Sequence, residues 1–206
     1  MTARRCTRDG RSLFVVEIER VSLDMDGFEV NAFVLHAPDG DVIVDAGAEP
    51  EKILAHVEKP VAAILITHGH RDHVGALDEV RRKTNVVVYA HPADAEDAGV
   101  KDYEPLVDGG DLELAGETVR VLHTPGHSPG SVTFVVGRDQ IVGDLILPGS
   151  VGRTDIAGGS WEEIEVSLRK VMPFWDGSTR LFTGHGTVLN AMEELETNPY
   201  LPLGVL

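Results

Sequence analysis

One short stretch of this sequence concentrates side chains that can hold a metal ion. Three imidazoles and one carboxylate fall within six residues, at His68, His70, Asp72 and His73. Imidazole nitrogen together with carboxylate oxygen suits zinc or iron rather than calcium or magnesium. A lone His-x-His pair is more often a solvated loop, but four ligand-type side chains in six residues favour a metal site.

The spacing within the stretch predicts two ions rather than one. In an extended segment, residues two apart project in the same direction, so His68 and His70 can reach one ion together. Asp72 and His73 lie at the turn into a following helix and should point elsewhere.

The flanking segments predict how this stretch is positioned. Residues 61–66 form an apolar run of the kind found in a buried parallel strand. The pattern from Val74 to Lys83 predicts a helix. The ligand-rich stretch is therefore predicted to be a tight loop at the carboxyl end of a strand, where open α/β sheets place their sites.

Three later loops each add one ligand-type residue after an apolar run. Proline and glycine fix the backbone on both sides of His127, as a pre-organised ligand needs. Asp144 follows Gly143 at the end of a predicted strand, and no helix follows at once for it to cap. His185 lies between two glycines at another strand end. Each residue alone would more often be structural, but with the first loop they complete a two-ion site.

The order and spacing of these residues resemble the metallo-β-lactamase superfamily over nearly the whole chain. The resemblance implies an α/β fold, an αββα sandwich of two mixed β-sheets flanked by helices. Family members use zinc, iron or manganese, and single-ion occupancy also occurs; we expect two divalent ions, zinc first. The implied ligand sets are His68, His70 and His127 for one ion, Asp72, His73 and His185 for the other, and Asp144 bridging both.

Within that superfamily, Gly143-Asp144 followed by residues 149–155 is similar to short hydrolases of the glyoxalase II type, and so is the ending at residues 198–201. Full-length glyoxalase II, a hydroxyacylglutathione hydrolase, continues into a helical domain that helps hold glutathione, whereas this sequence stops at Leu206. The resemblance therefore implies the hydrolytic machinery and leaves glutathione specificity open.

The Gly-Arg-Thr-Asp segment at residues 152–155 is also similar to one in persulfide dioxygenases, which use a single iron held by two histidines and one aspartate. On that pattern His68, with His70 or His127 and with Asp144, would suffice for one iron. A sulfur dioxygenase is therefore the main alternative, followed by a lactonase or β-lactamase, which no residue pattern selects. A non-catalytic metal-binding module would bind metal without turnover.

The implied chemistry is hydrolysis. Two ions about 3.5–4 Å apart can share a water and lower its pKa to about 7, so a bridging hydroxide would be the nucleophile. Two divalent cations exceed the charges of Asp72, Asp144 and one hydroxide by a single positive charge, which would stabilise the oxyanion formed at a carbonyl. We expect a glyoxalase II-like hydrolase of thioesters or esters, in which Asp72 is a ligand that also shuttles a proton.

Composition narrows the classes of partner. The 206 residues carry 34 acidic against 18 basic side chains, a formal net charge of −16. That acidity argues against a nucleic-acid partner and against binding to anionic membranes. The longest apolar runs are too short to span a membrane, and no signal-peptide core follows the N-terminal arginines. With one cysteine, Cys6, a reducing cytoplasmic setting is expected. We expect a small-molecule substrate, and the oligomeric state stays open.

The remaining patterns predict one domain, residues 1–206. His123 is a candidate outer partner of His127, Arg71 a candidate contact for an anionic substrate, and Arg153 with Asp155 a candidate ion pair; Trp161 would line the pocket.

We expect strands at 12–21, 28–36, 41–45, 61–66, 85–89, 111–114, 117–122, 131–136, 140–142 and 179–183, helices from Pro50, over 74–83, 92–98, 161–171 and 188–196, and a loop over 143–160.

Overall fold

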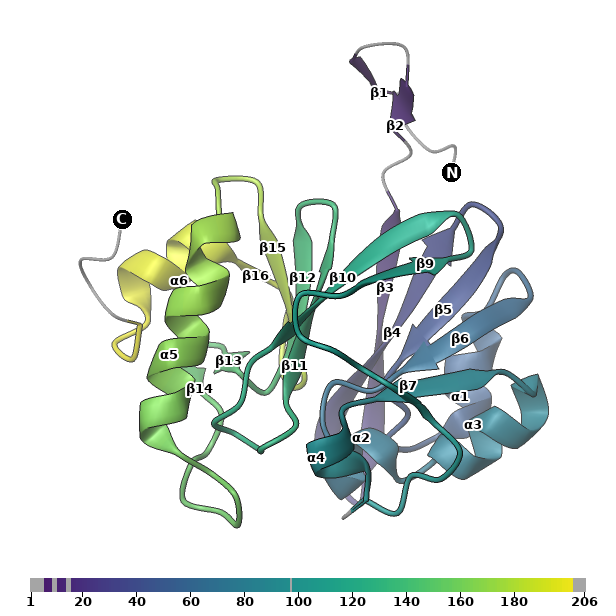
Figure 1. The fold of residues 1–206 in the computed structure, drawn as a ribbon, viewed down its shortest axis with the longest axis horizontal. Coiled ribbons are helices and arrows are strands. Elements are labelled where there is room, and N and C mark those ends of the chain that lie inside the picture. The colour runs from purple at the N-terminus through teal and green to yellow at the C-terminus, as the bar shows by residue number, and fades with distance from the viewer. Residues whose placement is uncertain (1–5, 9–10, 14–15, 97, 202–206) are drawn as a thin grey trace.

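The computed structural model describes residues 6–8, 11–13, 16–96 and 98–201, with the side chains described from residue 16 onward, so Cys6 and the N-terminal arginines lie outside the description of side chains. Two six-stranded sheets face each other, and helices cover their outer faces (Figure 1). The αββα sandwich expected from the sequence is therefore confirmed.

The first sheet holds the N-terminal half of the chain. Its strands, in spatial order, are β3 (Glu17–Met25), β4 (Phe28–Ala37), β5 (Gly40–Val44), β6 (Val61–Leu65), β7 (Val87–Ala90) and β8 (Glu104–Pro105). Strands β3 to β5 pair antiparallel, whereas β5 to β8 pair parallel. Its outer face carries α1 (Pro50–Ala55) and α3 (Leu77–Thr84), and the short helices α2 (Arg71–Val74) and α4 (Pro92–Ala95) lie at its edge (Figure 1).

The second sheet holds the C-terminal half. Its order is β16 (Leu189–Asn190), β15 (Arg180–Thr183), β12 (Asp139–Gly143), β11 (Val132–Val136), β10 (Glu117–His123) and β9 (Asp111–Leu114). Only β12 and β15 pair parallel within it. Helices α5 (Trp161–Val171) and α6 (Ala191–Thr197) lie on its outer side, and two short pairs, β1 (Cys6–Arg8) with β2 (Arg11–Leu13) and β13 (Ile146–Leu147) with β14 (Ser150–Val151), stand apart from both sheets.

Alternation along the strands builds the layers. Successive side chains of a strand point to opposite faces, so Phe33 and Leu35 of β4 enter the core between the sheets while Val34 packs under the helices of its own side. In the second sheet, Phe182 enters the central core and Leu181 packs towards α5. Three apolar layers therefore fix the two sheets and their helices in place.

Strand direction brings the predicted ligand loops to one edge. Strands β5 and β6 run parallel, so the segments that follow them leave at the same end of the first sheet. In the second sheet β12 runs parallel to β15, and two antiparallel pairings give β10 the same direction as β12. The loops after β10, β12 and β15 consequently emerge together.

Several element boundaries differ from the sequence-based expectation. The helix expected over 74–83 is two helices, α2 and α3, because Gly75 and Ala76 interrupt it, and α2 already begins at Arg71. The expected loop over 143–160 contains the β13–β14 pair. The strand expected at 12–21 runs instead over β3, and short strands β8 and β16 join the sheet edges. In the part of the chain that the structure describes, every helix is too short or too polar to cross a membrane.

Candidate metal centre

All seven side chains singled out in the sequence meet at this edge of the two sheets. Three overlapping groups have ligand atoms within 4.8 Å of one another. Their members come from the segment after β6 and from the loops after β10, β12 and β15. The groups are His68, His70 and His127, called the first group; Asp72, His73 and His185, called the second group; and His68, His73 and Asp144, which overlaps both.

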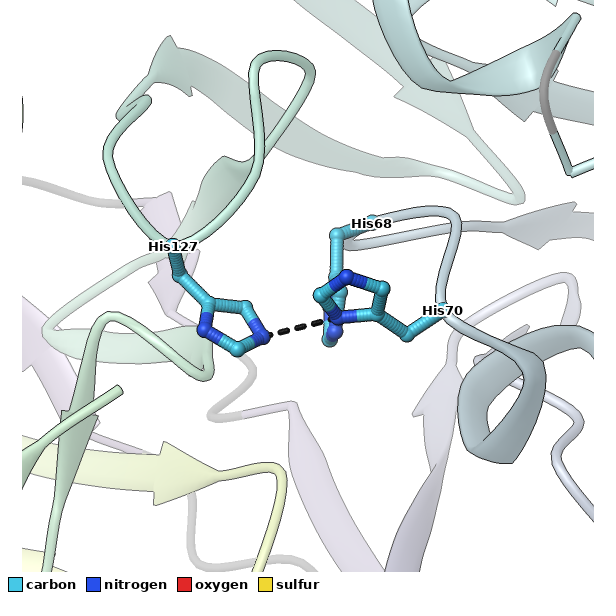
Figure 2. Close-up of side chains that lie close together, drawn as sticks. All are labelled: His68, His70 and His127. Carbon is cyan, nitrogen blue, oxygen red and sulfur yellow. Dashed lines mark hydrogen bonds between the residues drawn. The ribbon is translucent and has the colours of Figure 1, made fainter. Parts of the chain in front are cut away.

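The first group joins one loop from each half of the molecule. His68 and His70 lie on the segment between β6 and α2, and His127 lies on the loop between β10 and β11. Figure 2 shows the three rings converging, with His70 Nδ1 only 2.8 Å from His127 Nε2. The expectation that His68 and His70 project to the same side agrees with this geometry.

The second group is positioned by a helix rather than by the expected loop. Asp72 and His73 lie in the single turn of α2, where the amides of His73 and Val74 bond to the carbonyl of His70. This turn directs both side chains away from His70 and towards His185, whose Nε2 is 3.3 Å from Asp72 Oδ2. The helical turn is thus the physical reason why Asp72 and His73 face His185, whereas His68 and His70 face His127.

Asp144 lies between the two groups. One of its carboxylate oxygens is 3.5 Å from His127 Nε2 and 3.4 Å from His185 Nε2, and the other is 3.6 Å from His73 Nε2. Only 8% of the residue is exposed. A carboxylate in this place can contact an ion in either group.

Fixed acceptors orient the histidines from outside the cluster. Asp45 lies 2.7 Å from Nδ1 of His73, the carbonyl of Arg153 lies 2.9 Å from Nδ1 of His127, and the carbonyl of Glu29 lies 2.6 Å from Nδ1 of His185. Each ring therefore turns its Nε2 inward, an arrangement that metal-binding histidines generally need.

Asp45 is a site residue that the sequence reasoning missed. Its buried carboxylate also accepts the amide of Thr67 at 2.8 Å and the hydroxyl of Thr67 at 2.7 Å, which ties the first ligand segment to the end of β5. A signal is present in the sequence, because Asp45 follows a buried strand as Asp144 does, but the pattern around it predicts only a strand end.

Three buried atoms in the cluster lack a hydrogen-bond partner among the described residues: His68 Nε2, His73 Nε2 and Asp144 Oδ1. Buried polar atoms are nearly always paired, because an unpaired one keeps its desolvation cost. All three belong to the same group of facing ligand atoms. The donor set therefore fits divalent cations, and ions bound on either side of Asp144 would satisfy these atoms.

The first and second groups differ in the pKa values of their histidines, because burial and neighbouring charges act on them differently. Burial and the neighbouring histidines hold the pKa of His68 well below its usual value, and burial also lowers the pKa of His127. Burial opposes protonation of His185 too, but hydrogen bonds to Asp144 and Asp72 raise its pKa to about 10. The same contacts overcome the effect of burial on the carboxylates and lower the pKa of Asp72 and that of Asp144 to about 2.

A pocket of about 630 Å³ opens beside His70. Its wall comes from both halves of the molecule, with Arg71 and Asp78 on one side and Pro129 and Ala157 on the other. Arg71 is exposed and lines this pocket, so it stays a candidate contact for an anionic substrate. The pocket is large enough for a small organic molecule next to the first group.

The other residues considered in the sequence have structural contacts. His123 stacks on His91 at 4.1 Å and its Nε2 lies 2.8 Å from the carbonyl of Pro129, so it reaches the His127 loop but not the ring of His127. Arg153 and Asp155 form the expected ion pair at 2.9 Å. Trp161 is not among the residues that line the pocket and instead packs against Tyr200.

Comparison with known sequences places these features in a family. A model described as the metallo-beta-lactamase superfamily matches residues 25–185, a range that includes all seven residues of the cluster. A probable metallo-hydrolase of Bacillus subtilis, YqgX, is 36% identical over 195 residues, covering 84% of this chain and 92% of the relative. The hydroxyacylglutathione hydrolase GloC of Haemophilus influenzae is 29% identical over 183 residues, covering 77% of this chain and 86% of GloC.

Solved structures give the same result. The B3 metallo-beta-lactamase BLEG-1 superposes with a TM-score of 0.81 at 30% identity, covering 90% of this chain and 99% of BLEG-1. TTHA1623, solved in a di-iron-bound form, superposes with a TM-score of 0.77 at 35% identity, covering 89% of this chain and all of that structure.

Proposed function

The chain belongs to the metallo-beta-lactamase superfamily, and from that premise we propose that it is a metal-dependent hydrolase that cleaves a thioester or ester of a small molecule. The observation that carries the proposal is a set of buried atoms on His68, His73 and Asp144 that have no hydrogen-bond partner in the described part of the chain. They face one another where the ligand segments of both halves meet. Two divalent ions would be held by His68, His70 and His127 and by Asp72, His73 and His185, with Asp144 between them.

When bound, such ions supply a water of lowered pKa and an electrophile for a carbonyl oxygen. The chain's own residues do the rest. Asp144 is close to ring nitrogens of both groups, so its carboxylate fixes the distance between the first and the second group of side chains. Asp72 is about one quarter exposed at its side chain, which leaves it able to exchange a proton with solvent while it faces His185. We propose that Asp72 shuttles that proton.

The substrate class follows from the pocket and from one relative. The pocket beside His70 accommodates a small molecule, and Arg71 offers a cation at its wall. GloC of Haemophilus influenzae, named as a hydroxyacylglutathione hydrolase, covers most of this chain, which supports a glyoxalase II-like reaction on a thioester. Zinc is the proposed metal because imidazole and carboxylate ligands suit it; the similar TTHA1623 was solved with two irons, and manganese is a further choice.

We also propose that residues 1–206 act as one domain and that the protein works in the cytoplasm. Continuity of the central core across both halves of the chain supports the first proposal, since β4 and β15 contribute to the same apolar layer. The single cysteine of the sequence supports the second.

The experiment that tests the function uses metal-depleted protein and protein reloaded with zinc, iron or manganese. Each form is offered hydroxyacylglutathione thioesters, simple esters, lactones and β-lactams, and oxygen uptake is followed with glutathione persulfide. We expect turnover of a thioester that needs added metal and that is abolished in His70→Ala and Asp144→Ala. Oxygen uptake with persulfide in place of hydrolysis would instead assign a sulfur dioxygenase, and metal binding without any turnover would refute the enzyme proposal.

A further inference from the structure

Each proposed ion site is assembled across the two sheets, so something must hold the ligand segments of the two halves together in the correct register. His68 and His70 come from the first sheet and His127 from the second. Asp72 and His73 come from the first sheet and His185 from the second. Two buried polar side chains outside the ligand set make these connections.

Asp94 connects the ligand segments of the first group. It lies in α4 and is only 7% exposed. Its Oδ2 accepts the amide of Gly69 at 2.9 Å, between His68 and His70, and also the hydroxyl of Ser128 at 2.5 Å. Its Oδ1 accepts the amide of Gly130 at 2.5 Å, on the loop of His127. One carboxylate therefore binds both segments that carry this group.

The chain makes room for Asp94 on both segments. A Cβ atom added at Gly69 would lie 3.0 Å from Cβ of Asp94 and 2.9 Å from its carbonyl oxygen, and one added at Gly130 would lie 2.6 Å from its carboxylate carbon. Contacts this close exclude any larger residue without a shift of backbone. The approach of both loops to Asp94 is thus built into the sequence at two positions.

Asn31 connects the segments of the second group. It lies in β4 of the first sheet and is fully buried. Its Nδ2 donates to the carbonyl of Thr183 at 2.8 Å and to that of Gly186 at 2.9 Å, on the two sides of His185, and its backbone amide donates to the carbonyl of Gly184 at 2.8 Å. Arg20 also donates to the carbonyl of Gly186, at 2.5 Å. The His185 loop of the second sheet is thereby fixed to the first.

We propose that Asp94 and Asn31 are positioning residues that separately set the two ion affinities, Asp94 for the ion of His68, His70 and His127, and Asn31 for the ion of Asp72, His73 and His185. The inference rests on the two-ion site proposed above. Neither side chain belongs to the groups of ligand atoms, so each acts through the backbone of a ligand loop.

The test measures zinc binding directly and does not depend on turnover. Competition with a chelator gives two dissociation constants for metal-depleted protein, and anomalous scattering from crystals soaked at limiting zinc assigns each constant to a site. We expect Asp94→Asn to weaken the first site by about 10-fold or more and to leave the second nearly unchanged, the effect typical of losing an outer partner of a ligand. Asn31→Leu, which has a similar volume and no charge change, is expected to do the reverse.

Two further comparisons separate positioning from charge and from misfolding. Asp78→Asn removes a negative charge from the wall of the same pocket, at a side chain on α3 that is exposed, and is expected to bind zinc as the unchanged protein does. Ser128→Ala removes the hydroxyl that donates to Asp94 and contacts Ser131. Arg20→Ala removes the guanidinium that donates to Glu29, Asn31 and the carbonyl of Gly186. Both variants keep the bonds from Asp94 or Asn31 to the loop backbone, so we expect smaller losses at the first and second site respectively. Removing the positive charge of Arg20 would by itself strengthen cation binding nearby. A weaker zinc affinity at the second site in Arg20→Ala would therefore arise from lost positioning of the His185 loop.

The outcomes are distinct. Two results would overturn the positioning proposal and leave the two-ion site intact. In the first, Asp94→Asn or Asn31→Leu alters both zinc dissociation constants equally. In the second, Asp78→Asn weakens zinc binding as much as Asp94→Asn does. Failure of the unchanged protein to bind zinc would overturn both.

Discussion

The carboxylate of Asp45 lies 2.7 Å from Nδ1 of His73, and both side chains are completely buried. Because Nδ1 is held from outside, Nε2 of His73 faces Asp144 and has no partner of its own among the described residues. The pair fixes the orientation of one candidate ligand ring of the cluster, and the first prediction follows from it.

Replacing Asp45 by asparagine is expected to weaken zinc binding at the second group by about 10- to 100-fold, because an amide cannot accept from His73 and from both donors of Thr67 at once. Chelator competition measures the loss. Asp41→Asn is the matched control, since Asp41 is equally buried on β5, the strand that Asp45 follows, but accepts the amides of Glu58 and Lys59, away from the cluster. Equal losses in the two variants would show a general cost of removing a buried carboxylate.

Arg71 gives a prediction about specificity. It lines the pocket beside His70, and a cation there favours substrates with a carboxylate. Arg71→Ala is expected to raise KM for a carboxylate-bearing thioester by about tenfold while kcat changes little, and to leave KM for an uncharged thioester nearly the same. Arg82→Ala, an exposed arginine on α3, provides the control. An equal rise in KM for both thioesters would contradict a role in recognising charge.

The pKa values predict that the two groups release different numbers of protons when they bind metal. In the metal-free protein the pKa of His185 is about 10, so between pH 7 and 9 its ring is protonated and must lose a proton to bind an ion. Affinity at the second group should therefore rise at least about tenfold per pH unit over this range. The pKa values of His68 and His127 are lowered, so these rings are already neutral and release no proton.

Calorimetry in two buffers of different protonation enthalpy counts the released protons for each ion. We expect one proton or more for the ion of the second group, and none from His68 and His127 for the other. The same release for both ions would contradict the assignment of His185 to one group alone.

The central core offers a prediction about stability. Phe33 of the first sheet and Phe182 of the second meet edge to face, with ring centres 5.7 Å apart, and both are essentially inaccessible. Phe182→Ala should lower the free energy of unfolding by about 3–5 kcal/mol, because it leaves a cavity between the sheets. Urea unfolding of metal-free protein measures this. Phe174→Ala, at a side chain 45% exposed, should cost clearly less; equal costs would contradict the layered core.

The ligand cluster could be predicted because its signals are local. Residue types and short spacing single out His68 to His73, and an apolar run before each later loop places His127, Asp144 and His185 at strand ends. The layers could be predicted from the same alternation that now separates Phe33 from Val34. The resemblance to a family adds the grouping of these residues around two ions, and that grouping stays a prediction.

The parts that escaped prediction depend on residues distant in sequence. Asn31 is 152 residues from Thr183, and Asp94 is 36 residues from Gly130, so neither role is visible in a local pattern. The turn of α2 was interpreted as loop because four residues are too few to show helical periodicity. The β13–β14 pair is equally short and has no alternation to detect.

The central claim is that two ions bind at the places formed by these ligand groups, and anomalous diffraction from zinc-loaded crystals tests it most directly. We expect two anomalous peaks, one among His68, His70 and His127 and the other among Asp72, His73 and His185, with Asp144 in contact with both. A zinc-loaded crystal with no peak at this cluster, or with its peaks elsewhere on the molecule, would contradict it.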